Sequence, residues 1–201
     1  VFTSQKLESL GEGTMAIGRL DENSEGLLML TTDGKISEEI RSAHYEKQYV
    51  VQVDGIITTE AIEKLKNGVE IGVKGERLIT KECFAEIIEK PKYVGEGYRI
   101  RSDRHGPTSW LTITLTQGKF RQVRKMTAAV GFPTLRLIRI RIGNWKLEGM
   151  SVGEAAKIER ENSDLLANKS VGAEWFRTIE EEIRNAQIYA RASQQFVYTD
   201  E

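Results

Sequence analysis

Two stretches of the chain alternate between apolar and polar side chains, and each is followed at once by a helical pattern. In the first, QYVVQVDGII, the Val, Tyr and Ile residues predict a strand over residues 48–57. The next segment, TTEAIEKLKNGV, opens on Thr58 and repeats apolar residues at helical spacing up to a glycine. This change of period limits the fold, because it requires strands and helices to share one core.

The second alternating stretch, WLTITLTQG, ends in a turn at Gln117-Gly118, and KFRQVRKMTAAVG then places apolar residues at helical spacing before Gly131 and Pro133 stop the pattern. Strand signals return in TLRLIRIRIGNWKL, residues 134–147. Strands mixed with a few helices predict an α+β fold.

Composition narrows the class of protein. The 201 residues, 39% of them hydrophobic, are enough for one buried core. Cys83 is the only cysteine, so an intrachain disulfide is excluded, and its apolar neighbours suit a buried thiol in a reducing compartment. Two histidines and one cysteine argue against a zinc site, and no apolar run is long enough to span a membrane. We expect a cytoplasmic protein without a metal.

The net charge of -1 hides an uneven distribution. Residues 91–146 contain 12 Lys and Arg against 2 Asp and Glu, whereas residues 1–90 contain 11 against 17. A basic stretch inside a near-neutral chain is typical of a protein that binds a polyanion. The alternative is a basic face that pairs with the acidic part of the same molecule.

The stretch GRLDENSEGLLMLTTDG, residues 18–34, places Asp21 in a turn between the strand pattern MAIGRL and a second strand that ends at an Asp33-Gly34 turn. The simplest interpretation is a polar surface turn. A carboxylate on a short connection between rigid strands also suits catalysis, because its neighbours fix its orientation and a nearby guanidinium would keep it ionised.

The stretch around Asp21 resembles the active-site motif of bacterial ribosomal RNA pseudouridine synthases of the RsuA/RluB/RluE family. EKQYVVQVDG is similar to the family's Lys-x-Tyr strand, and GKFRQVRKMTAAVGFPTLRLIRIRIG is similar to its third motif, in the same order. The resemblance covers about residues 14–158, and the PTSWLTITL run is similar to the RluE branch, which modifies large-subunit ribosomal RNA. It implies a catalytic fold with a mixed, largely antiparallel central sheet flanked by helices and loops.

The resemblance also implies roles for single residues. Asp21 takes the place of the catalytic carboxylate, Tyr49 that of the tyrosine that packs on the target base, and Arg124 that of the arginine that pairs with the carboxylate. Leu137 matches an apolar residue beside the flipped nucleotide. Core packing for Leu137 and Tyr49, and a phosphate contact or solvated charge for Arg124, stay open as alternatives.

The implied reaction isomerises uridine in ribosomal RNA, that of the large subunit in the RluE branch, and needs no cofactor. The sequence does not decide whether Asp21 attacks C1′ or removes the 2′ proton. The target nucleotide must be flipped out of its helix. Side chains expected to bind the RNA are Arg19, Arg121, Gln122, Lys125, Arg99, Arg101 and Arg104, and Arg136, Arg139 and Arg141 are expected to extend the same basic surface. A solvated loop is the alternative for the segment between Pro91 and Trp110.

The expected organisation is a catalytic domain over residues 1–158 and a mainly helical C-terminal extension over residues 159–201, where EEEIRNAQIYARASQQF predicts a long helix. The family's Lys-Pro segment is missing before the first strand, and the chain opens on Val1, so we leave open whether a segment precedes it. We favour a monomer.

Two other functions remain in competition. One is a noncatalytic RNA-binding or ribosome-assembly module that uses the same basic surface. The other is an unrelated hydrolase in which Asp21 works with Glu22 or Glu25 as an acid/base pair, although the basic stretch fits sugars poorly.

Overall fold

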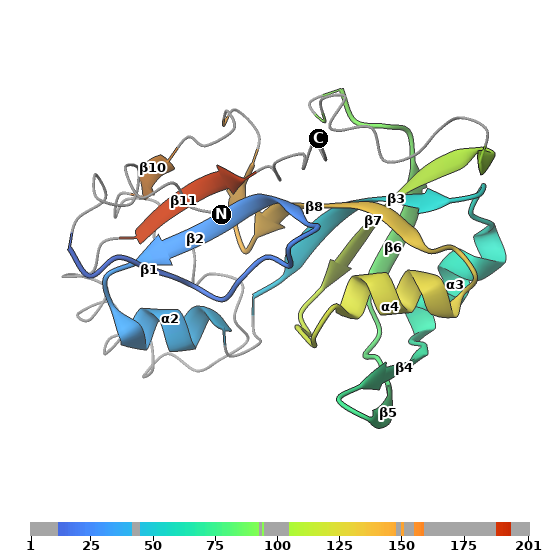
Figure 1. Ribbon diagram of the computed structural model, residues 1–201, viewed down its shortest axis with the longest axis horizontal. Helices are drawn as coiled ribbons and strands as arrows, with labels where there is room; N and C mark the ends of the chain where they lie inside the picture. Colours follow the sequence, from blue (N-terminus) through green and yellow to red (C-terminus); the bar gives the residue numbers. More distant parts are fainter. Residues whose placement is uncertain are drawn as a thin grey trace, which may run out of the picture.

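The computed structural model describes residues 12–41, 45–92, 94, 105–147, 150, 155–158 and 188–193 (Figure 1). One sheet of nine strands runs through this part of the chain. Its strands are β1 (Met15–Ala16), β2 (Glu25–Thr31), β3 (Lys47–Asp54), β6 (Phe84–Ile88), β7 (Thr108–Leu115), β8 (Thr134–Ile142), β9 (Trp145–Lys146), β10 (Ala155–Ile158) and β11 (Ile188–Ser193). A small hairpin and the helices complete the described elements: β4 (Glu70–Val73), β5 (Glu76–Ile79), α2 (Gly34–Arg41), α3 (Thr59–Asn67) and α4 (Gln122–Ala129).

The sheet follows the order β10-β11-β2-β8-β3-β7-β6, with β1 added to β2 and β9 added to β8. The β2–β8 pair is parallel, and the other described strand pairs are antiparallel. The expected α+β fold with a mixed, largely antiparallel sheet is therefore confirmed.

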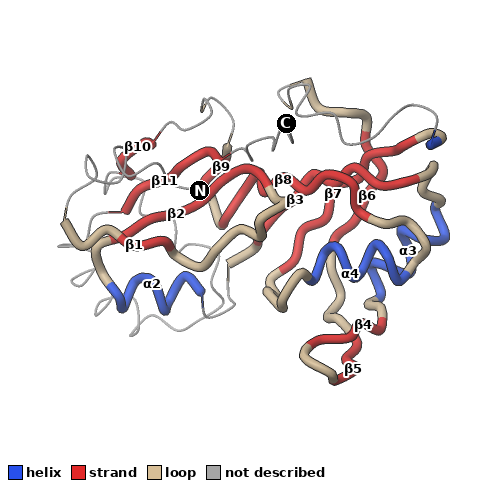
Figure 2. Tube along the Cα trace, in the orientation of Figure 1, coloured by secondary structure: helices blue, strands red, loops and turns tan. Residues whose placement is uncertain are grey.

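Two lobes share this sheet (Figure 1). We call β1, β2, α2, β10 and β11 the β2 lobe, and β3, β6, β7, α3 and α4 the β3 lobe; β8 joins them. Figure 2 shows α2, α3 and α4 on the same side of the sheet. The lobes meet where β2 and β8 pair, which involves only Glu25 with Ile138 and Gly26 with Arg139. The strand pairing that joins the lobes is therefore short.

Each lobe has its own hydrophobic core on the helix side of the sheet. In the β3 lobe, Leu65 of α3 and Met126 of α4 pack with Val51 of β3 and are fully buried. In the β2 lobe, Ile36 and Ile40 of α2 pack on Leu27 and Met29 of β2. A third, smaller cluster of Val50, Val94 and Ile138 lies on the opposite face of β3 and β8. Two cores on one side leave room for a cleft between them.

Local signals account for two of the helices. The Thr58 side chain accepts a hydrogen bond from Ala61 N at 3.3 Å and caps α3, as the pattern after it predicts. Asp33 Oδ1 accepts from Lys35 N at 2.7 Å at the start of α2. The sequence predicted only a turn at Asp33-Gly34, and α2 was missed because its helical start is a glycine and its apolar side is confined to two buried isoleucines.

Gly26 allows the lobes to approach each other. Its φ is +104°, and a Cβ at this position would lie 2.2 Å from the carbonyl oxygen of Arg139. A side chain is therefore excluded where β2 meets β8, and the glycine that follows the Asp21 turn is needed for the junction itself.

The C-terminal part differs from the prediction where it is described. Residues 188–193 form β11, which pairs with β2 from Gly26 to Thr31, although the sequence pattern predicted helix there. An available edge of β2 outweighs the local helical preference of this segment. The rest of the predicted extension, from 159 to 187 and from 194 to 201, lies outside the described residues, so the boundary at residue 158 stays a prediction.

Within the described residues, no helix is both long enough and apolar enough to cross a membrane.

Candidate active site

A cleft of about 430 Å³ lies where β2 and β8 separate. After its first two residues, β2 leaves β8, and β1 pairs with β2 further along. The connection between β1 and β2 forms one wall of the cleft, the cleft-facing residues of β3 and β8 form its floor, and the turn between β7 and α4 forms the opposite wall. The sequence motifs are thereby brought together from three separate parts of the chain.

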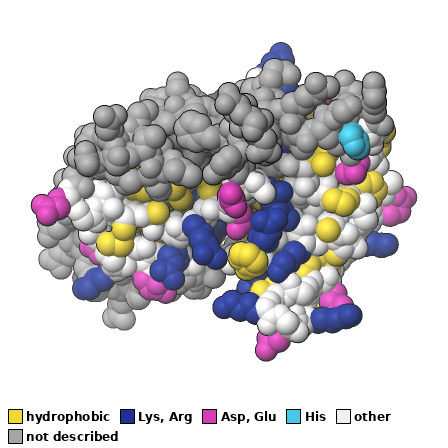
Figure 3. Space-filling view, viewed as in Figure 1, with side chains coloured by type: hydrophobic (Ala, Val, Ile, Leu, Met, Phe, Trp, Pro, Cys, Tyr) yellow, Lys and Arg dark blue, Asp and Glu magenta, His cyan; other side chains and the backbone are white. Residues whose placement is uncertain are grey.

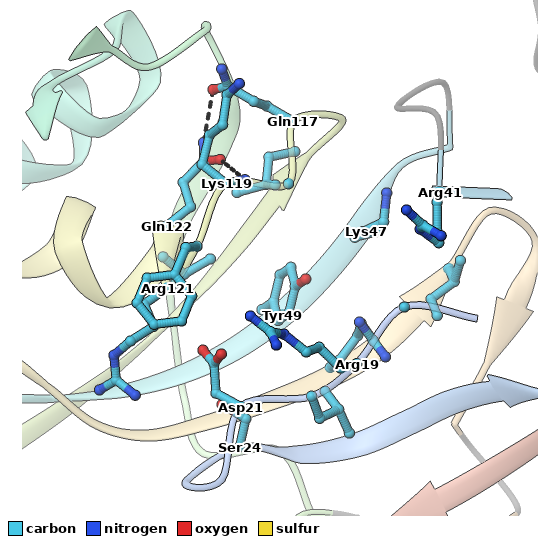
Figure 4. Close-up of a pocket in the computed structure, with 18 of the residues that line it drawn as sticks. Arg19, Asp21, Ser24, Arg41, Lys47, Tyr49, Gln117, Lys119, Arg121 and Gln122 are labelled. Carbon is cyan, nitrogen blue, oxygen red and sulfur yellow. Dashed lines mark hydrogen bonds between the residues drawn. The ribbon is translucent and has the colours of Figure 1, made fainter. Parts of the chain in front are cut away.

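Asp21 lies on the first wall, half-buried, in a turn closed by a hydrogen bond from Ser24 N to Asp21 O at 2.9 Å. Figure 4 shows its carboxylate pointing away from the turn and into the cleft. Within the described residues, the structure records no hydrogen bond or ion pair to this carboxylate. It is thus placed on a fixed backbone and left available to a ligand.

Tyr49 and Leu137 come from the floor. Tyr49 is on β3 and pairs with Arg139 on β8, and Leu137 precedes Arg139 by two residues, so all three side chains share the cleft face. Figure 4 shows the Tyr49 ring directed into the cleft that also receives Asp21. Leu137 is only 5% exposed and belongs to the β3-lobe core as well as to the cleft lining, so both of its suggested roles fit.

Arg124 reaches the Asp21 turn by a different contact from the one expected. Its Nη2 donates to the carbonyl oxygen of Asn23 and, at 3.4 Å, to Ser24 Oγ. Arg124 is not among the residues that line the cleft, and the predicted ion pair with Asp21 is not formed. The guanidinium connects α4 to the backbone of the turn that carries Asp21.

The opposite wall is a turn held in shape by Gln122. The Oε1 of Gln122 accepts from Lys119 N at 2.9 Å, and its Nε2 donates to Gln117 Oε1 at 2.9 Å (Figure 4). Gln122 is only 5% exposed, so its amide serves the turn more than it serves a ligand. The residue before it, Arg121, is in the left-handed region at φ 51° and lines the cleft.

Positive charge dominates the cleft. Six of its lining residues are cations and two are acids, namely Arg19, Arg41, Lys47, Lys119, Arg121 and Arg139 against Asp21 and Glu38. Figure 3 shows Lys and Arg side chains gathered in the middle of this face, where the lobes meet. Such a field attracts polyanions and concentrates them at the site.

Phe120 is an exposed aromatic residue of this wall that the sequence analysis did not single out. The residue is 49% exposed and lines the cleft. The Arg19 guanidinium lies 5.9 Å from the ring centroid, and Lys125 Nζ lies 5.2 Å from it. Lys125 also donates to Gly72 O at 2.6 Å and does not line the cleft, and its expected contact with the RNA stays a prediction.

Of the β8 arginines expected to extend the basic surface towards the site, Arg136 lies in the interior and Arg139 lines the cleft. Arg136 is 4% exposed and forms a double hydrogen bond with Glu25, Nε to Oε1 at 2.6 Å and Nη2 to Oε2 at 2.8 Å. Arg139 is 6% exposed and faces the cleft. Arg141 is more accessible and pairs with Glu46 at 2.8 Å. Strand alternation and the β2 contact bury the first two, which a charge count along the chain does not reveal.

The Glu25–Arg136 pair also removes one alternative function. A carboxylate that is fully engaged by a buried guanidinium cannot serve as the second acid of a hydrolase with Asp21. Glu22 is exposed and does not line the cleft. The acid/base pair is therefore not formed by either residue.

Lys47 is the lysine of the Lys-x-Tyr strand, and the sequence analysis gave it no role of its own. It lies two residues before Tyr49 on an alternating strand, which already places both side chains on one face. Burial, followed by the charge of Arg139, lowers the pKa of Lys47 below its ordinary value.

Arg99, Arg101 and Arg104, which were expected to bind RNA, lie outside the described residues.

Comparison with known proteins assigns the family. The model of a family described as RNA pseudouridylate synthase matches residues 2–129. The chain belongs to this family. The resemblance found in the three motifs is thereby confirmed, and the fold agrees, because a solved structure titled "Crystal structure of pseudouridylate synthase" superposes with a TM-score of 0.54 at 28% identity, covering 68% of this chain and 51% of that one.

Each of three curated relatives covers more than two thirds of this chain. Ribosomal large subunit pseudouridine synthase E of Vibrio vulnificus (strain CMCP6) is 40% identical over 145 residues, which cover 71% of this chain and 60% of the relative. The enzyme of the same name from Xanthomonas axonopodis pv. citri (strain 306) is 38% identical, with 68% and 71% covered. Ribosomal large subunit pseudouridine synthase B of Yersinia pestis is 35% identical, with 68% and 38% covered. The chain thus spans 60% of the length of the Vibrio relative.

Proposed function

We propose that this chain isomerises a uridine of large-subunit ribosomal RNA to pseudouridine, with Asp21 as the catalytic carboxylate. The observation that carries the proposal is that Asp21 and Tyr49 face one cleft whose lining is rich in cations. The relatives that are named for this reaction on the large ribosomal subunit support it.

The reaction breaks the bond between C1′ of the ribose and N1 of uracil, turns the base, and joins C1′ to C5. The proton that leaves C5 is balanced by one that N1 gains, so no redox partner is needed. Asp21 acts at the sugar, either by attacking C1′ or by removing the 2′ proton. Both routes need an ionised carboxylate that is fixed in place. Asp21 fits this need, because its backbone lies in a hydrogen-bonded turn and its carboxylate has no partner among the described residues.

The neighbouring residues position the reactants. The Tyr49 ring stacks on the uracil from the floor, and Leu137 excludes water beside it. Arg124 acts on Asp21 through the backbone, since it holds the carbonyl of Asn23 in the same turn. Flipping the uridine out of an RNA helix costs a few kcal/mol, which contacts between the cationic walls and the RNA backbone offset.

The test is release of tritium from C5 of uridine-labelled ribosomal RNA transcripts. We expect the parent chain to release tritium and the Asp21→Asn variant to release none above background, because the amide can neither attack C1′ nor accept the 2′ proton. Glu22→Gln is the matched control: it removes the next carboxylate of the same turn, which is exposed, and should keep the parental rate.

Release by Asp21→Asn at the parental rate would refute the assignment of the carboxylate. Absence of release by the parent, together with retained RNA binding, would favour the noncatalytic RNA-binding module. Mapping the modified uridine on both ribosomal RNAs then tests the large-subunit assignment.

A further inference from the structure

The floor of the cleft holds a buried arginine that is only partly satisfied. Arg139 Nε donates to Leu27 O at 2.8 Å, which ties the side chain to β2. Its Nη2 is buried and has no hydrogen-bond partner among the described residues. Buried guanidinium groups are normally paired or fully hydrogen-bonded, because burial without a partner destabilises the charged form. The unused donor therefore indicates a ligand that is not part of this chain.

A second cation lies beside it. Lys47 lines the same cleft and donates from Nζ to Tyr45 O at 3.2 Å, a neutral acceptor. The structure records no ion pair between Lys47 or Arg139 and an acid among the described residues. Glu38, one of the two acids of the lining, instead contacts Arg41 at 3.4 Å. Two like charges held together without an acid form a site that an anion would stabilise.

We propose that Lys47 and Arg139 form a subsite for one backbone phosphate of the RNA, next to the uridine that reacts. This inference rests on the proposed function for the identity of the polymer. Uracil is neutral and cannot compensate two positive charges, whereas a phosphodiester brings one negative charge and several acceptor oxygens.

The position of the subsite agrees with the length of a nucleotide. Arg139 is the direct cross-strand neighbour of Tyr49, and Lys47 lies two residues from Tyr49 on the same face. Directly opposed side chains on neighbouring strands start about 5 Å apart. A base stacked on Tyr49 would thus have its own phosphate, or the next one, within reach of both cations. The phosphate would also bring the ribose of the same nucleotide towards Asp21.

The experiment measures binding and does not depend on turnover. Fluorescence anisotropy gives the affinity for a labelled oligouridylate, a single strand that needs no flipping, over a series of salt concentrations. Removal of one phosphate contact should reduce the slope of log K against log salt by about 0.7 for a single strand. We expect that reduction, with weaker binding, in Lys47→Met. Lys64→Met, which removes an exposed lysine of α3 outside this cleft, should keep the parental slope.

Neutral methylphosphonate linkages then locate the phosphate that the subsite binds. Oligouridylates with one such linkage at successive positions should show one position where the parent loses affinity and Lys47→Met does not. The proposal would be overturned if every neutral linkage that weakens binding by the parent also weakened binding by Lys47→Met. A parental salt slope in folded Lys47→Met would overturn it as well.

Arg139 is tested by two variants because its bond to Leu27 O contributes to the structure. Arg139→Met should lower the salt slope, and Arg139→Lys, which keeps the charge, should retain it. Inorganic phosphate serves as the second probe, and its binding is followed by the chemical shift of the Lys47 side chain. A shift that saturates with phosphate, while the salt slopes for oligouridylate stay parental in the variants, would assign the subsite to a free anion and overturn the RNA assignment.

The outcomes separate the two proposals. If tritium is released while the Lys47→Met slope is parental, the phosphate subsite is wrong and the proposed function stands. If the slope changes but no tritium is released, the chain binds RNA through this subsite without isomerising uridine.

Discussion

The arginines on the two faces of β8 differ in whether their guanidinium groups have a full set of partners. On one face, Arg136 is buried against Glu25 with both ends of the ion pair satisfied. On the other, Arg139 is buried to a similar degree and lines the cleft, yet its Nη2 has no partner among the described residues. The first arrangement closes the junction between the lobes, and the second leaves a charge available to a ligand. Burial alone therefore does not distinguish a structural arginine from a functional one.

The largest expected effect on stability comes from breaking the Glu25–Arg136 ion pair. Glu25→Gln removes the carboxylate that accepts two hydrogen bonds from the buried Arg136, and we expect the free energy of unfolding to fall by about 3–5 kcal/mol. Urea denaturation measures this loss. Glu46→Gln is the control, because Glu46 is half-exposed where it pairs with Arg141, and its loss should be about 0–1 kcal/mol. Equal losses in the two variants would show that the buried pair is not what joins β2 to β8.

A smaller effect on stability is expected from removing Arg139, on the cleft face of β8. Arg139→Met leaves Leu27 O without its donor, which destabilises, but it also removes a buried charge that has no anion. We expect the free energy of unfolding to fall by about 1 kcal/mol in the absence of RNA. The same urea series measures it. A loss as large as that of Glu25→Gln would mean that Arg139 is a structural residue like Arg136, and the contrast between the two faces would disappear.

The smallest effect concerns the protonation of Lys47. Burial and then the charge of Arg139 lower its pKa below the ordinary 10.5, so Arg139→Met should raise it while leaving the effect of burial in place. An NMR titration of the Lys47 side chain measures this. Because the unfolded chain binds the proton more tightly, the contribution of Lys47 to stability increases as the pH rises from the folded-state pKa towards 10.5. An unchanged pKa in the variant would show that the two cations do not interact across the cleft floor.

The elements that could be predicted are those with a strong period and a clear end. Strand β3, the helix α3 with its Thr58 cap, β7, α4 and β8 all follow the expected order. The helix α2 and the strand β11 could not be predicted, since each depends on β2 for a surface to pack on or an edge to pair with. Their sequences carry no local signal strong enough to decide the matter alone.

The candidate site shows the same division. Ordered motifs predicted that Asp21, Tyr49, Arg121 and Leu137 belong to one site, and the structure brings them into one cleft. Arg124 contacts the Asp21 turn through the carbonyl of Asn23, and its catalytic role stays a prediction. The spacing of the Lys-x-Tyr strand already places Lys47 on the face of Tyr49. The availability of Arg139 could not be predicted, since it depends on which strand approaches β8 from each side.

The sequence by itself determined the family, the order of the main elements and the residue that carries the proposed chemistry, because these depend on local period and on motifs. Only the tertiary structure decided which of several identical arginines is neutralised and which is left for a ligand. The reason is that charge compensation in a protein interior acts over a few ångströms between residues far apart in the chain: Arg136 meets Glu25 across 111 positions, and Arg139, three residues further along, meets no acid among the described residues.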